Sequence, residues 1–202
     1  RLAAVPSESL RPSATTAFDD VLVAIPTYNE AENAPRLVRE LREHLPGATL
    51  VVIDDSSPDG TGDLVAAACA SDPLVRVVCR PSKLGLGTAY LVAFDEARRA
   101  GARIVMTMDS DFSHPPRYAP AIIEAARRND VDLAIGSRYV PGGSVVGWSR
   151  GRTVLSSVAN SLIKSALDVS VTDCTGSFRA YRMDLINRLD LTAKTLPHPD
   201  VD

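Results

Sequence analysis

The stretch VLVAIPTYNEAENAPRLVRELREHLPGATLVVIDDSSPDGT, residues 21–61, contains a complete strand–helix–strand unit. It begins with an uninterrupted apolar run at Val21–Ile25, which is typical of a strand buried on both faces. Apolar residues then recur at three-to-four spacing between Glu30 and Leu45, which indicates an amphipathic helix. A second apolar run follows at Leu50–Ile53, so the unit predicts two parallel strands joined by a helix.

The same alternation continues along the chain. Further strands are predicted at 74–79, 103–108 and 131–135, with helices at 61–70, 88–100 and 118–128. We therefore expect an α/β fold of Rossmann-like type, with a mostly parallel sheet covered by helices on both faces. Residues 1–18 lack periodicity and are expected to form an extended tail. The expected single domain spans residues 19–202.

Composition excludes several classes of protein. The chain has 202 residues and a formal net charge of −3, which gives no basic excess for binding nucleic acid. No apolar run approaches the ~20 residues that span a bilayer. The 3 cysteines are an odd number without a CxxC pair, which favours a reducing compartment over a disulfide framework or zinc site.

Polar residues gather where each predicted strand ends. The first strand runs into Pro26-Thr27-Tyr28-Asn29-Glu30, and the second into Asp54-Asp55 and a turn that contains Asp59. Ligands of open α/β sheets bind at the carboxyl ends of the strands. A carboxylate there can accept hydrogen bonds from a base or a ribose. The alternative is that Asp59 or Thr61 only caps the next helix.

The third strand leads into Lys83-Leu84-Gly85-Leu86-Gly87-Thr88. Its glycines allow the backbone to approach a ligand, and Lys83 can face a phosphate. The segment matches neither a Walker loop nor GxGxxG. A turn with Thr88 capping the following helix is the alternative.

The fourth strand runs into Asp109-Ser110-Asp111, one of three Asp-x-Asp triplets in the chain. The other two lie at 130–132 and 200–202. Only the first follows a strongly apolar strand, where two carboxylates can converge on one hard cation. Mg²⁺ and Mn²⁺ prefer such oxygen ligands and share them with substrate phosphates.

Residues 133–167 contain basic side chains and no acidic one. On a helix predicted at 151–167, Arg152 and Ser156 lie on one polar stripe with Asn160. Arginines beside a hydroxyl suit an anionic phosphate, and a solvated helix face is the alternative. A second alternative is a serine hydrolase, because residues 147–151 match GxSxG around Ser149. That pattern lacks the buried strand that should precede the nucleophile.

Seven motifs taken together resemble glycosyltransferase family 2, and within it the dolichol- or polyprenol-phosphate mannose synthases. In chain order they are IPTYNE, VIDDSSPDGT, KLGLGTA, MDSDFSHPP, GSRYVPGG, W-x3-R-x3-S-x3-N and DCTGSFRAYR, from Ile25 to Arg182. The resemblance implies the A-type glycosyltransferase fold, which agrees with the alternation of strands and helices.

The resemblance also implies roles for individual residues. The nucleotide-sugar site would comprise Pro26, Tyr28, Glu30, Ile53, Asp55, Lys83 and Ser110. The catalytic metal pair would be Asp109 and Asp111, holding Mg²⁺ or Mn²⁺ together with Ser113, at a position where relatives often have Gln. The acceptor phosphate would bind Arg138, Arg152 and Ser156.

The implied activity is inverting transfer of mannose from GDP-mannose to a polyprenyl monophosphate. Another sugar nucleotide, such as UDP-glucose, is the alternative donor, and a nucleotide-binding or inactive fragment is a third possibility. The implied location is the cytoplasmic face of a membrane. Attachment there would be peripheral, through a partner or through a segment outside this sequence. We also expect the family's catalytic domain to continue beyond Asp202.

Overall fold

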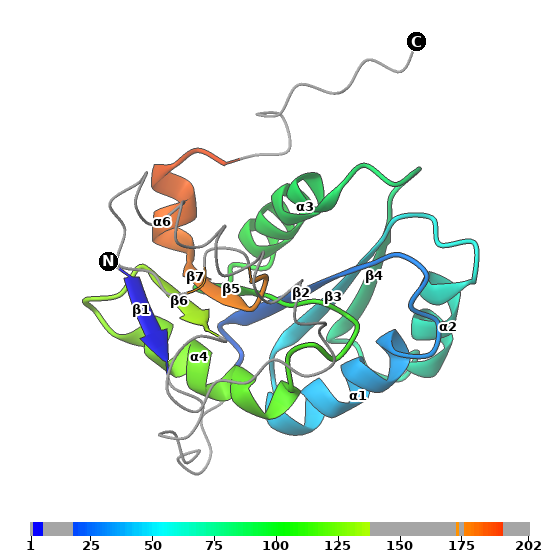
Figure 1. The fold of residues 1–202 in the computed structure, drawn as a ribbon, viewed down its shortest axis with the longest axis horizontal. Helices are drawn as coiled ribbons and strands as arrows, with labels where there is room; N and C mark the ends of the chain where they lie inside the picture. Colours follow the sequence, from blue (N-terminus) through cyan, green and yellow to red (C-terminus); the bar gives the residue numbers. More distant parts are fainter. Residues whose placement is uncertain (1, 6–17, 138–172, 174–175, 192–202) are drawn as a thin grey trace, which may run out of the picture.

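A computed structural model describes residues 2–5, 18–137, 173 and 176–191, and the structural statements below concern these residues. They form one sheet of seven strands flanked by helices (Figure 1). The strands are β1 (Leu2–Val5), β2 (Val21–Thr27), β3 (Thr49–Asp54), β4 (Val75–Cys79), β5 (Ile104–Thr107), β6 (Leu133–Gly136) and β7 (Arg179–Arg182). Across the sheet their order is β1-β6-β7-β5-β2-β3-β4.

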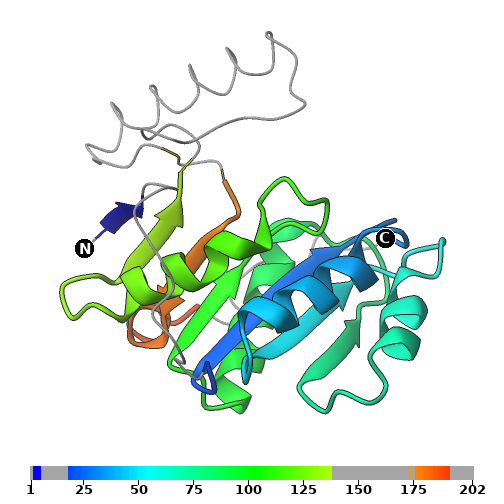
Figure 2. The ribbon, with the colours of Figure 1, turned by 90° about the horizontal axis from the view of Figure 1, so that it is seen from below.

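Helices cover both faces of this sheet. They are α1 (Ala34–His44), α2 (Thr61–Ala68), α3 (Leu86–Arg99), α4 (Ala119–Arg127) and α6 (Met183–Arg188), with a short 3-10 helix, η1 (Pro116–Tyr118). Residues of α1, α2 and α4 share one apolar cluster, and residues of α3 and α6 share the other. Figure 1 shows α3 and α6 on one side of the sheet, and Figure 2 shows α1 and α4 in front of the opposite side.

Strand β2 shows why its sequence is apolar without alternation. Val21, Val23 and Ile25 pack into the cluster beneath α1 and α4. Leu22 and Ala24, which point the other way, pack beneath α3. Both faces of the strand are therefore buried, and the predicted α/β architecture is confirmed.

The sheet contains one reversal that the sequence pattern did not indicate. β2 pairs in parallel with β3 and β5, whereas β7 lies antiparallel between β5 and β6. The β7 sequence, Arg-Ala-Tyr-Arg, places an arginine at each end and has no apolar run. Its position depends on pairing with two strands far away in the sequence, which a local pattern does not reveal.

Three further observations differ from, or extend, the predicted elements. Residues 2–5 of the expected tail form β1, which pairs in parallel with β6. Helix α1 begins at Ala34 instead of Glu30, because the Glu30 carbonyl accepts the N–H groups of Asn33 and Ala34 in a preceding turn. The helix predicted at 151–167 lies outside the described residues. No helix among those described has the length and hydropathy needed to cross a bilayer.

Candidate active site

The loops that follow β2, β3 and β5 each contain a residue with left-handed backbone geometry. These are Asn29 (φ 60°), Ser56 (φ 53°) and Phe112 (φ 60°). A non-glycine residue in this region is uncommon and marks a sharp change of direction. The polar motifs predicted from sequence therefore occupy tight turns at one edge of the sheet.

Three consecutive backbone amides join the β2–α1 loop to the β3–α2 loop. The N–H groups of Asn29, Glu30 and Ala31 donate to Ser57 Oγ (3.0 Å), Thr61 Oγ1 (2.9 Å) and Asp59 Oδ2 (3.1 Å), respectively. Each bond satisfies a backbone donor that no strand or helix pairs. The two loops are thus fixed to each other before any ligand binds.

Asp59 supports this junction and also the start of α2. Its Oδ1 accepts the Thr61 hydroxyl (2.6 Å) and the Thr61 N–H (3.0 Å). The hydroxyl bond is the main reason why the pKa of the Asp59 carboxyl lies below its usual value. The N-cap residue of α2 is Gly60, so Asp59 is not the N-cap. Asp59 nevertheless accepts the N–H of Thr61, the first residue of the helix.

The two neighbouring acids at the end of β3 have different partners. Asp54 accepts the Thr27 hydroxyl (3.0 Å), the Ser57 hydroxyl (2.6 Å) and the Ser57 N–H (3.0 Å). Asp55 forms a buried bidentate ion pair with Arg80, in which Nη2 is 2.7 Å from Oδ2. Asp54 therefore stabilises the turn after β3, whereas Asp55 links the end of β3 to Arg80.

Arg80 was not among the predicted site residues, yet it ties three segments together. Besides Asp55, its guanidinium donates to the Thr88 hydroxyl (2.5 Å) and to the Gly85 carbonyl (3.2 Å) at the start of α3. The Thr88 hydroxyl is also bonded to the Leu84 carbonyl (2.9 Å), and the N-cap of α3 is Gly85, so Thr88 is not the cap. Planar two-point contacts with a carboxylate are characteristic of arginine.

Lys83 and Tyr28, predicted from different motifs, meet in the structure. The Lys83 ammonium lies 4.0 Å from the centroid of the Tyr28 ring, a cation–π contact. Both side chains are exposed at the loop edge. Glu30 also lies on these loops, and its carboxylate accepts the Asn33 side-chain amide (2.8 Å).

Pro26 and Ile53 are adjacent in the sheet. They pair in the β2–β3 register, and the Ile53 side chain is fully buried beneath α3. Ile53 thus helps to shape the floor of the loop region by packing.

The Asp109-Ser110-Asp111 triplet follows the end of β5 after one residue, Met108. The buried Ser110 hydroxyl donates to the Pro26 carbonyl (3.3 Å), which links the triplet to the β2 loop. Asp111 is exposed, and its Oδ1 accepts the Ser113 N–H (2.9 Å). Two carboxylates and a hydroxyl therefore lie within one turn of chain.

A buried histidine packs beneath this turn. The His114 ring stacks on Phe178 with centroids 4.9 Å apart, and its Nε2 lies 3.8 Å from Asp109 Oδ2. The Phe178 ring in turn fills the space over Gly136, where a Cβ would lie 2.5 Å from its Cδ1. The carboxylate turn thus rests on a rigid aromatic support.

The donor set of this turn fits a hard divalent cation. No group of three or more His, Cys, Asp or Glu ligands occurs in the part of the chain that the structure describes. Mg²⁺ commonly binds through one or two carboxylates together with waters and substrate phosphates. Asp109 and Asp111 match that pattern, in which the substrate completes the coordination.

Two sets of predicted residues lie outside the described residues. They are the acceptor-phosphate residues Arg138, Arg152 and Ser156, and Ser149 of the hydrolase alternative.

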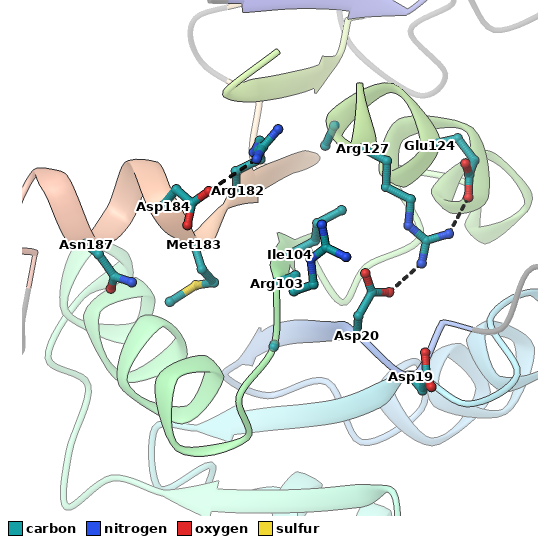
Figure 3. Close-up of a pocket in the computed structure, with 12 residues that line it drawn as sticks. Asp19, Asp20, Arg103, Ile104, Glu124, Arg127, Arg182, Met183, Asp184 and Asn187 are labelled. Atoms are coloured by element: carbon teal, nitrogen blue, oxygen red, sulfur yellow. Dashed lines mark hydrogen bonds and ion pairs between the residues drawn. The ribbon is translucent and has the colours of Figure 1, made fainter. Parts of the chain in front are cut away.

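A separate pocket opens at the opposite edge of the sheet. Its lining includes Asp20 and Arg103, which precede β2 and β5, together with Arg127 and Arg182 (Figure 3). Arg127 forms ion pairs with Asp20 and with Glu124 there. Because this pocket lies at the amino ends of the strands, it is distinct from the site built by the loops.

Comparison with known proteins identifies the family. The model of the family described as glycosyl transferase family 2 matches residues 22–190. The chain belongs to glycosyltransferase family 2. The strand-end loops with their Asp-x-Asp turn are thus the candidate active site of a family 2 glycosyltransferase domain.

Two curated relatives are considerably more similar to this chain in sequence than the solved structures are. The chain is 45% identical over 173 residues to a polyprenol monophosphomannose synthase of Mycolicibacterium smegmatis, covering 85% of this chain and 65% of that protein. It is 42% identical over 173 residues to an undecaprenyl-phosphate mannosyltransferase of Micrococcus luteus, covering 86% and 70%. The chain therefore spans about two thirds of the length of each relative.

Solved structures support the fold. A mannosyltransferase from Pyrobaculum calidifontis, in complex with GDP-Man and Mn²⁺, is 22% identical with a TM-score of 0.61, covering 94% of this chain and 53% of that one. Glucosyl-3-phosphoglycerate synthase from Mycobacterium tuberculosis, in complex with Mn²⁺, UDP-Glc and phosphoglyceric acid, is 20% identical with a TM-score of 0.61, covering 87% and 64%.

Proposed function

We propose that this domain transfers mannose from GDP-mannose to a polyprenyl monophosphate, with inversion at the anomeric carbon. The observation that carries the proposal is the hydrogen bond from the Ser110 hydroxyl to the Pro26 carbonyl. It joins the carboxylate turn to the loop with the predicted nucleotide residues. The names of the two curated relatives support the acceptor class, and the GDP-Man complex of a fold neighbour supports the donor.

The nucleotide is held by loops that are already ordered. Asp55, oriented by Arg80, would accept hydrogen bonds from the base, and the exposed Tyr28 and Lys83, which contact each other, would belong to the same nucleotide site. Such pre-organisation reduces the entropy lost when the donor binds. Asp109 and Asp111, together with Ser113, would hold Mg²⁺ or Mn²⁺. The cation supplies Lewis-acid stabilisation of the departing GDP.

The acceptor needs little activation by the protein. A phosphate monoester has a second pKa of about 6, so it is largely a dianion at neutral pH. Its oxygen forms the bond to the anomeric carbon as the bond to GDP breaks, and GDP leaves with the electron pair. Arg138, Arg152 and Ser156 are proposed to hold the acceptor phosphate in line, a positioning contribution.

The acceptor class also implies where the domain acts. A polyprenyl chain lies within a bilayer, so we propose that the domain works at a membrane surface. We assign it to the cytoplasmic face. The odd number of cysteines without a CxxC pair favours a reducing compartment.

The test is turnover of radiolabelled GDP-mannose by the purified protein with polyprenyl phosphate and Mn²⁺ or Mg²⁺. We expect a labelled lipid, and we expect chelation or Asp111→Ala to abolish its formation. Asp130→Ala is a matched control, because Asp130 is an exposed acid of another Asp-x-Asp triplet and forms a surface ion pair with Arg128. Turnover of UDP-glucose but not GDP-mannose would reject the donor, and full activity of Asp111→Ala would reject the metal site.

A further inference from the structure

Two buried hydroxyl groups lie near each other, and neither has a hydrogen-bond partner at normal distance among the described residues. They are the Tyr90 hydroxyl on α3 and the Ser177 hydroxyl just before β7. The Ser177 side chain is almost fully buried, and the Tyr90 oxygen has no solvent contact. A buried polar group without a partner is rare in folded proteins and calls for an explanation.

The strand register places Ser177 beside the carboxylate turn. In the antiparallel β5–β7 pair, Thr107 lies opposite Arg179. Continuing that register by two residues places Ser177 opposite Asp109. The Thr107 hydroxyl donates to the Ser177 carbonyl (2.6 Å), which fixes the Ser177 backbone at this point.

Tyr90 reaches the same place from the helix that covers β5. Tyr90 packs against the apolar cluster that α3 shares with β2 and β5. Burial and the nearby Asp109 carboxylate raise the pKa of the Tyr90 phenol well above its ordinary range, whereas Arg179 and a hydrogen-bond contact with the Ser177 side chain lower it. A phenol hydroxyl can donate a hydrogen bond to a carboxylate.

Asp109 is the natural acceptor for both hydroxyls. Its carboxylate accepts no hydrogen bond among the described residues and has only the 3.8 Å contact with His114 Nε2. Asp111, by contrast, already accepts the Ser113 N–H. Carboxylates that ligate a metal are usually oriented by hydrogen bonds from surrounding residues. In ligand-free sites such bonds are often long and shorten only when the ligand binds.

On the basis of the proposed function, we propose that Tyr90 and Ser177 are positioning residues for Asp109. Their hydroxyls donate to the Asp109 carboxylate when it binds the divalent cation of the nucleotide sugar. They fix the direction in which the remaining carboxylate oxygen faces the cation.

The experiment measures Mn²⁺ affinity in the presence of GDP by electron paramagnetic resonance, so it does not depend on turnover. The variants are Tyr90→Phe and Ser177→Ala, each of which removes only a hydroxyl. Tyr181→Phe is the control, because Tyr181 is a neighbouring tyrosine that packs edge-on against Phe94. Loss of an orienting residue typically weakens metal binding ~10–100-fold. We expect about a tenfold higher Kd in either variant, with an unchanged Kd in the control.

Two further measurements separate positioning from a general effect on the fold. Tyr90→Phe should change the thermal unfolding midpoint little, because its hydroxyl makes no hydrogen bond of normal length with the described residues. In an Asp109→Asn background, Tyr90→Phe should cause no additional loss of Mn²⁺ affinity. An additional tenfold loss in that background would overturn the proposal.

The wild-type measurement distinguishes failure of the proposed function from failure of the positioning role. Wild-type protein that binds no Mn²⁺ in the presence of GDP would contradict the proposed function. Wild-type protein that binds Mn²⁺, together with Tyr90→Phe and Ser177→Ala variants of unchanged affinity, would overturn only the positioning role.

Discussion

Replacing Arg80 with methionine would leave the Asp55 carboxylate buried without its counterion. The side chains of Arg80 and Asp55 are only 6% and 9% exposed, and the guanidinium contacts both carboxylate oxygens. Methionine has a similar length but neither charge nor N–H donors. The same change also removes the bond to the Thr88 hydroxyl, so the start of α3 loses an anchor.

The expected cost follows from this burial. Breaking a buried ion pair by removing one partner costs about 3–5 kcal/mol, because the remaining charge is desolvated and uncompensated. Arg76→Met, in β4 four residues before Arg80, is the matched control. Arg76 is 44% exposed, and its partner Glu96 keeps a second ion pair with Arg99. The control should therefore cost about 0–1 kcal/mol.

Urea unfolding followed by circular dichroism gives both free energies of unfolding. A double variant, Arg80→Met with Asp55→Leu, should recover most of the loss, since no buried charge remains. Its recovery identifies the uncompensated carboxylate as the cause. The reasoning would be refuted if Arg80→Met cost no more than Arg76→Met.

Two other changes test local features of the same framework. Gly136→Ala would place a Cβ 2.5 Å from Phe178 Cδ1, so we expect a loss of about 1–3 kcal/mol in urea unfolding. Gly87→Ala in α3 meets no atom within 4 Å and should stabilise the protein by roughly 0.5–1 kcal/mol; a loss there would contradict the open geometry. The Thr61 hydroxyl holds the pKa of Asp59 below 3.8, so its stabilisation is present above that pH and is lost as the pH falls through the lowered folded-state pKa. Asp59→Asn should therefore flatten the dependence of the urea midpoint on pH below 3.8, and an unchanged curve would exclude this role.

The parts of the fold that sequence predicts well are those set by local pattern. β2 was recognisable because both of its faces are buried, so its apolar run is continuous. β7 was not recognisable as a strand, because its sequence has only a weak preference for strand structure and its pairing with β5 and β6 determines its conformation. The turn after β5 was likewise predictable, since polar residues follow an apolar strand directly.

The residues that contact the predicted site residues were harder to predict from the sequence. Asp55 was singled out from its place after β3, yet its ion pair with Arg80 joins residues 25 positions apart. Tyr90 and Ser177 give no signal as a pair, because their proximity depends on α3 covering β5 and on the β7 register. The sequence thus indicates which groups carry the chemistry, whereas the fold supplies the groups that orient them.

The antiparallel insertion of β7 has a consequence for the order of folding during synthesis. β2, β3, β4 and β5 leave the ribosome early and pair with one another directly. β6 pairs only with β1 until β7 emerges, because β7 separates it from β5. The bond between Thr107 and Ser177 closes a separation of 70 residues. Since closing long loops is slow, we expect the Asp109 turn to assemble with its neighbours late in the folding of the described residues.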